Sequence, residues 1–191
     1  RVRHAYLPLE DAMGHALGLQ PATSIVLDKY QRLMGSPQGQ VCLDAARQIF
    51  LLHPFDSAKA LVCGLTFWFD GWDPNSSMSK ANKTPIWSGT VTLVFATLDG
   101  IIMFVTTRLL ASGPGKADHT EVIQRLQENI QQLQESCSSS TFWVRAMQNH
   151  AKVYPFVLHT VCDQPERRTI AGLMAGNSKL HSCFGVSCDT T

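Results

Sequence analysis

Two aspartates end apolar stretches of the chain, and they suit metal-ion chemistry if the fold brings them together. Asp70 follows the apolar residues 61–69, and Asp163 follows a similar run over residues 153–162. Neighbouring carboxylates repel each other, and a divalent cation removes that penalty. Oxygen ligands suit Mg²⁺ or Mn²⁺, and two such ions can activate the attacking oxygen and stabilise the leaving oxygen of a phosphodiester. An aspartate after a strand is also a common turn or helix-capping residue.

The runs that carry these aspartates have the length and composition of buried strands. Two more β-rich runs cover residues 86–98 and 101–110, and an Asp-Gly pair between them predicts a hairpin with a type I′ turn. An amphipathic pattern predicts a helix over residues 118–135. A right-handed crossover through that helix returns the fourth strand beside the first and parallel to it. The expected fold is an α/β mixed sheet: a meander of strands one to three, a crossover helix and a parallel fourth strand.

The chain before the first strand has a different character. Residues 1–58 are expected to form a helical leader, and residues 59–191 the core. Apolar residues at helical spacing predict helices over residues 22–34 and 41–52 of the leader. Within the core, residues 142–147 are expected to add a short strand.

The composition is that of a folded protein with no strong charge bias. The chain has 191 residues, of which 45% are hydrophobic, and its formal net charge is +1. It can bury a sizeable core, and nucleic-acid binding would need a local basic patch. No apolar run is long enough for a membrane helix, and no secretory signal opens the chain. Six scattered cysteines favour a reducing compartment, so the nucleus or another intracellular location is expected rather than secretion.

Several charged residues lie close in sequence to the two strand ends. Asp73 could supplement the first aspartate as a ligand, or serve the turn that contains it. Lys80 and Lys83 lie on the following polar loop, where they could touch a DNA backbone or remain solvated. Arg167 and Arg168 follow the second aspartate and could contact phosphates or pair with a neighbouring glutamate.

Four short motifs occur in a characteristic order along the core. They are Asp70-Gly71-Trp72-Asp73-Pro74-Asn75, Pro85-Ile86-Trp87, Gly113-Pro114-Gly115 and Val161-Cys162-Asp163-Gln164-Pro165. With these motifs, residues 60–190 resemble the transposases of CACTA-type and Plavaka-type DNA transposons, in which similar blocks follow one another. The resemblance implies a ribonuclease H-like core in which Asp70 and Asp163 are catalytic and bind Mg²⁺ or Mn²⁺.

The resemblance also implies an activity and its partners. Such a protein cleaves DNA by metal-dependent phosphodiester chemistry and joins the ends to a new site. Its partners would be transposon ends and target DNA, and a second copy of itself if it forms a homo-oligomer. It would not associate with a membrane. We therefore expect the full-length protein to be a nuclease-type transposase.

The chain departs from the family pattern in two places. No acid is well placed to be the third catalytic carboxylate, because Asp189 is two residues from Thr191. We expect the core to be truncated before that third acid and this fragment alone to lack turnover. The family often has a Cys-x-x-Cys zinc motif, whereas Cys183 and Cys188 are separated by four residues, with His181 nearby. Zinc binding by these three residues stays open, and so does the alternative that the two cysteines are buried or surface thiols.

Two other interpretations fit the same residues. One is a catalytically inactive, domesticated or decayed core that acts as a DNA-binding or protein-interaction module. The other is an unrelated α/β binding domain in which the strand-end aspartates are turn residues. Strands one and four that are distant or antiparallel would favour this last interpretation.

Overall fold

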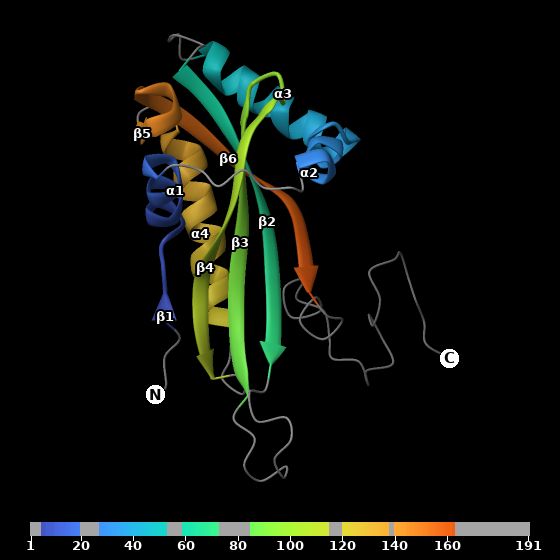
Figure 1. Cartoon of the computed structure of the whole chain (residues 1–191), viewed down its shortest axis with the longest axis vertical. Helices are drawn as coiled ribbons and strands as arrows, with labels where there is room; N and C mark the ends of the chain where they lie inside the picture. The colour runs from blue at the N-terminus through green and yellow to red at the C-terminus, as the bar shows by residue number, and fades with distance from the viewer. Residues whose placement is uncertain are drawn as a thin grey trace, which may run out of the picture.

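The strand β2 (Ala60–Trp72) is the centre of a mixed α/β structure. The structure is a computed structural model, and it describes residues 5–19, 27–52, 59–72, 85–114, 120–137 and 140–162. Six strands form one curled sheet in the order β1-β4-β3-β2-β6-β5 (Figure 1). The other elements are β1 (Ala5–Tyr6), α1 (Leu9–Gly18), α2 (Leu27–Met34), α3 (Pro37–Leu52), β3 (Ile86–Thr97), β4 (Ile102–Pro114), α4 (Thr120–Ser136), β5 (Phe142–Val144), the 3₁₀ helix η3 (Arg145–Met147) and β6 (Asn149–Cys162).

The predicted pairing of the four main strands is confirmed. β2 pairs with β3 and β3 pairs with β4 in antiparallel orientation, and together they form the expected meander. α4 then crosses over the sheet, and β6 returns beside β2 and parallel to it. A parallel neighbour requires such a crossover connection, because a tight turn can only reverse the chain.

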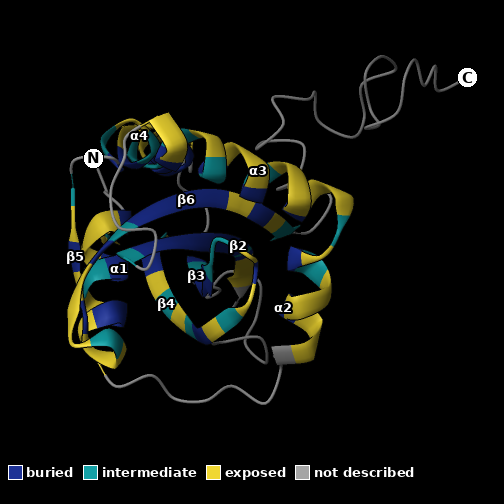
Figure 2. Cartoon of the chain, turned by 90° about the horizontal axis from the view of Figure 1, so that it is seen from above, coloured by how far each residue is buried: buried dark blue, intermediate teal, exposed yellow. Residues whose placement is uncertain are grey.

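Successive residues of β2 point to opposite faces of the sheet, and both faces are covered. Odd-numbered residues such as Cys63 and Phe67 join a core cluster with α1 and α4. Even-numbered residues such as Val62 join a second cluster with α2 and α3. Seen from above, the buried strands lie between helices whose outer surfaces are exposed (Figure 2). Because both faces are buried, the sequence of β2 is a nearly continuous run of apolar residues.

The structure corrects the predicted turn between β3 and β4. A type I′ turn requires positive φ at both central residues, but here only Gly100 has positive φ, at 80°. The Gly100 N–H donates to the Thr97 carbonyl, and the Thr97 N–H donates to the Ile101 carbonyl. This is a type I turn followed by a left-handed glycine, a three-residue hairpin loop with a bulge.

Several predicted boundaries were also wrong. α3 begins at Pro37 rather than residue 41, because Ser36 accepts a hydrogen bond from the Gly39 N–H and so caps the helix. The strand expected over residues 142–147 ends at Val144 and continues as η3. α1 and the two-residue β1 were not predicted. None of the described helices combines the length and apolar character needed to cross a membrane.

Candidate functional site

Asp70 lies at the carboxyl end of β2, where its side chain is exposed to solvent. Even-numbered residues of β2 face α2 and α3, so Asp70 is on that side of the sheet together with Thr66 and Trp68. Its carboxylate forms no hydrogen bond or ion pair with another described residue. The position is therefore open to a ligand from solvent.

The carboxyl end of β6 lies directly beside that of β2. Phe69 pairs with Cys162, which is the last residue that the structure describes. Ligands of α/β sheets commonly bind outside the carboxyl ends of neighbouring parallel strands. Asp70 thus lies at the carboxyl end of two parallel strands, where ligands of α/β proteins commonly bind.

The other predicted site residues lie outside the part of the chain that the structure describes. Asp163 follows Cys162 and lies outside the described residues. The same holds for the predicted supporting and zinc-binding residues: Asp73, Lys80, Lys83, Arg167, Arg168, His181, Cys183 and Cys188. Among the described residues, no group of three or more His, Cys, Asp or Glu side chains could hold a metal ion. Of the predicted metal ligands, Asp70 is the one that the structure describes.

Cys42 and Cys63 are free thiols. Cys63 is fully buried in β2, and burial raises the pKa of its thiol far above the ordinary value. A thiol of this kind packs as a small apolar group and does not react at neutral pH.

The surface beside Asp70 includes an aromatic and cationic contact that the sequence analysis did not single out. Trp68 is partly buried on the same side of β2, and the Lys29 ammonium of α2 lies 5.4 Å from the centroid of its ring. At this distance the ammonium is attracted to the ring face. No motif indicates this contact, because the two residues are far apart in the sequence.

Thr66 is an unusual polar residue behind this surface. It is 1% exposed, and its hydroxyl has no hydrogen-bond partner among the described residues. Its neighbour on β3, Thr92, shares a 3.0 Å hydrogen bond with Thr107 of β4. An unpaired buried hydroxyl costs on the order of 1–3 kcal/mol.

We therefore expect the substitution Thr66→Val to stabilise the protein. Valine keeps the branched shape, suits a strand and has no hydroxyl to desolvate. The free energy of unfolding in urea should rise by about 1 kcal/mol. The control Thr92→Val breaks an existing hydrogen bond and should give no such gain. A loss of stability with Thr66→Val would show that the Thr66 hydroxyl has a partner.

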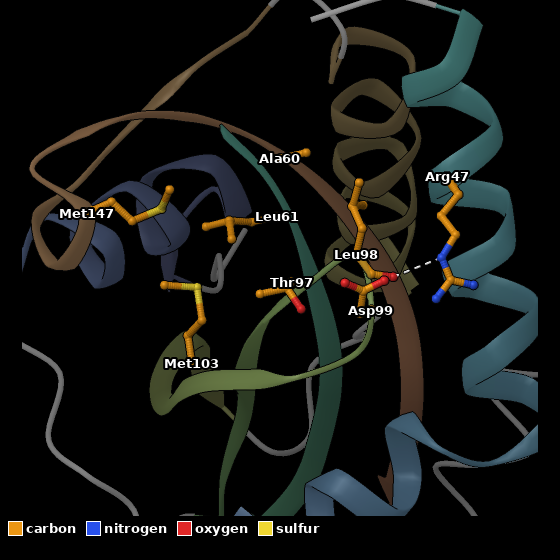
Figure 3. Close-up of a pocket in the computed structure, with 8 residues that line it drawn as sticks. All are labelled: Arg47, Ala60, Leu61, Thr97, Leu98, Asp99, Met103 and Met147. Carbon is orange, nitrogen blue, oxygen red and sulfur yellow. Dashed lines mark hydrogen bonds between the residues drawn. The ribbon is translucent and has the colours of Figure 1, made fainter. Parts of the chain in front are cut away.

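Figure 3 shows a cavity of about 550 Å³. It is lined by Ala60, the first residue of β2, and so lies at the opposite end of this strand from Asp70. Arg47 reaches it from α3, donates to the Leu98 carbonyl at 3.0 Å and pairs with Asp44. Its charge is thus already compensated. The lining residues are Arg47, Ala60, Leu61, Thr97, Leu98, Asp99, Met103 and Met147. The cavity is separate from the strand ends that carry the candidate chemistry.

No protein-family model matches the chain, and no curated protein matches it.

Proposed function

We propose that this chain is a ribonuclease H-like core of a DNA transposase, which cleaves and joins DNA by metal-dependent phosphodiester transfer. Asp70 and Asp163 would bind Mg²⁺ or Mn²⁺ at the carboxyl ends of β2 and β6. The strand order β4-β3-β2-β6, with only the last two parallel, supports this proposal. It is the order expected for strands three, two, one and four of that fold.

The observation that carries the proposal is a bulge between β2 and β6. Leu65 pairs with Val157, but the next residue, Thr66, pairs with His159. Leu158 is therefore an extra residue in β6. Bulges are rare between parallel strands, and they often redirect side chains next to active sites.

The bulge changes which side of the sheet the end of β6 presents. A shift of one residue moves every later side chain to the opposite face. Beyond the bulge, His159 pairs with Thr66 and Cys162 pairs with Phe69. If β6 continued in this register for one more residue, Asp163 would pair with Asp70 and share its face. Without the extra residue, Asp163 would pair with Gly71, on the side of α1 and α4.

This arrangement assigns each group a limited role. Bound divalent ions would activate the attacking oxygen and stabilise the leaving oxygen of the phosphodiester. Asp70 and Asp163 would hold the ions at adjacent strand ends. The covered sheet would keep the two carboxylates at a fixed separation, as positional catalysis requires. Phosphoryl transfer requires little covalent participation by protein side chains.

Metal binding by the full chain tests the proposal directly. We expect Mn²⁺ to bind, as measured by the loss of its free electron paramagnetic resonance signal. Asp70→Asn and Asp163→Asn should each weaken binding more than tenfold, because even the loss of an indirect partner of a metal ligand costs about 10–100-fold. The double substitution should add little, since either change alone leaves an incomplete site.

Asp99→Asn is a matched control, because Asp99 is an exposed aspartate in the hairpin at the opposite end of the sheet. It should leave Mn²⁺ affinity unchanged. Equal affinities for the wild-type chain and both site variants would contradict the metal site. Intact Mn²⁺ binding without any DNA cleavage by the full-length protein would favour a catalytically inactive core that retains the site.

A further inference from the structure

We infer that Lys29 and Arg32 of α2 bind the phosphodiester backbone of a nucleic-acid strand beside Asp70. This inference rests on the proposed function, because it assigns a place to the strand whose phosphodiester would react there. The contacts of α2 with β2, the charge on its exposed surface and the position of Trp68 support it.

α2 runs antiparallel to β2 and brings its first turn toward the Asp70 end of the sheet. Met34 near the end of α2 packs at Gly64, where its sulfur lies 3.4 Å from the position a Cβ would occupy. Lys29, at the start of α2, lies over Trp68. Trp68 and Asp70 are two residues apart on one face of β2, which places their Cα atoms about 7 Å apart. Lys29 is therefore close to the end of the strand that carries the candidate site.

The exposed surface of α2 carries two cations that no carboxylate compensates within the described part of the chain. Lys29 and Arg32 are both exposed and are three residues apart, so they are neighbours on the helix surface. The Arg32 Nε donates at 3.4 Å to the backbone carbonyl of Asp28, and the Asp28 carboxylate forms no ion pair with either cation. By contrast, Arg47 pairs with Asp44, and Arg125 pairs with Glu121.

Trp68 restricts what Lys29 can bind. The ring face attracts the Lys29 ammonium. Because Lys29 is exposed, its ammonium can still donate hydrogen bonds to an anion in solvent. With Lys29 over it, this ring face is not free to stack on a base. The pair is therefore suited to contact with a phosphate, which fixes the position of a strand without reading its sequence.

The salt dependence of DNA binding distinguishes such contacts from a structural role. The full chain is mixed with a fluorescently labelled DNA duplex of arbitrary sequence in EDTA, and the affinity is measured over a series of NaCl concentrations. Each phosphate contact contributes about 0.9 to the slope of log affinity against log salt concentration. Lys29→Ala and Arg32→Ala should each lower the slope by about 1, and the double variant by about 2. Lys29→Arg should retain the wild-type slope.

Arg145→Ala is the matched control, since Arg145 is an exposed cation in η3 at the opposite end of the sheet. It should leave the slope unchanged. An unchanged slope in the double variant, or a wild-type chain that does not bind the duplex, would overturn the inference. A fall in affinity accompanied by a fall in melting temperature, without a change in slope, would also overturn it by showing a structural role.

Asp70→Asn separates this inference from the proposed function. The carboxylate is not a phosphate contact, so this variant should bind DNA in EDTA with the wild-type slope. If Asp70→Asn left Mn²⁺ affinity intact while Lys29→Ala lowered the slope, the metal site would fail and the phosphate contact would hold. If the opposite results were found, the phosphate contact would fail and the metal site would hold.

Discussion

Asp70→Asn is expected to lower the Mg²⁺-dependent DNA cleavage rate of the full-length protein by about three orders of magnitude. A metal ion supplies several kcal/mol of transition-state stabilisation, and each 1.36 kcal/mol corresponds to about a tenfold change in rate. Asparagine keeps the size of the side chain and its capacity for hydrogen bonds but removes its charge. The rate of nicking of a supercoiled plasmid measures the effect.

A change of metal preference would tie the effect to ligation. Asp70→Cys should be inactive with Mg²⁺ and regain part of its activity with Mn²⁺, because a thiolate is a poor ligand for Mg²⁺ and a better one for softer ions. Asp99→Asn should cleave at the wild-type rate with either metal. Plasmid nicking by Asp70→Asn at more than a tenth of the wild-type rate would remove Asp70 from the catalytic role.

The pairing of the central strands could be predicted because its signals are local. β2 is a nearly continuous apolar run, β3 and β4 are rich in β-branched and apolar residues, and an Asp-Gly pair marks the hairpin. α4 has a clear amphipathic pattern, and the handedness of crossover connections then leaves few places for β6. The same crossover argument predicted that the carboxyl end of β2, which carries Asp70, lies beside the carboxyl end of β6. The signal for α1 was also present, since Leu9, Ala12 and Ala16 recur at helical spacing.

Features that depend on contacts between distant residues could not be predicted. The bulge at Leu158 has no turn residue to mark it, and its side chain packs in the second core cluster like those of regular positions. The contact between Lys29 and Trp68 depends on how α2 docks on the sheet. The left-handed Gly100 was predictable as a glycine turn, but the turn type depends on the strand register at Ala96 and Ile102.

Gly39 in the first turn of α3 is expected to be essential to the packing of α2 against α3. A Cβ at this buried position would lie 2.6 Å from the Leu33 carbonyl oxygen and would also clash with the Met34 carbonyl. Both neighbours are backbone atoms, so no side-chain rotation can relieve the clash. Gly39→Ala should lower the free energy of unfolding by about 3 kcal/mol, the upper range for overpacking. Urea unfolding followed by circular dichroism measures this loss.

Gly18→Ala provides the matched control, because a Cβ on Gly18 at the end of α1 would meet nothing within 4 Å. With no clash, the substitution reduces the entropy of the unfolded chain and should stabilise the protein by up to about 1 kcal/mol. The two glycine substitutions thus have opposite expected signs, and the difference between them isolates the packing of α3 on α2. If Gly39→Ala were neutral, α3 could move away from the Leu33 and Met34 carbonyls at no cost. A large loss would instead mean that α2 and α3 are packed at a fixed separation.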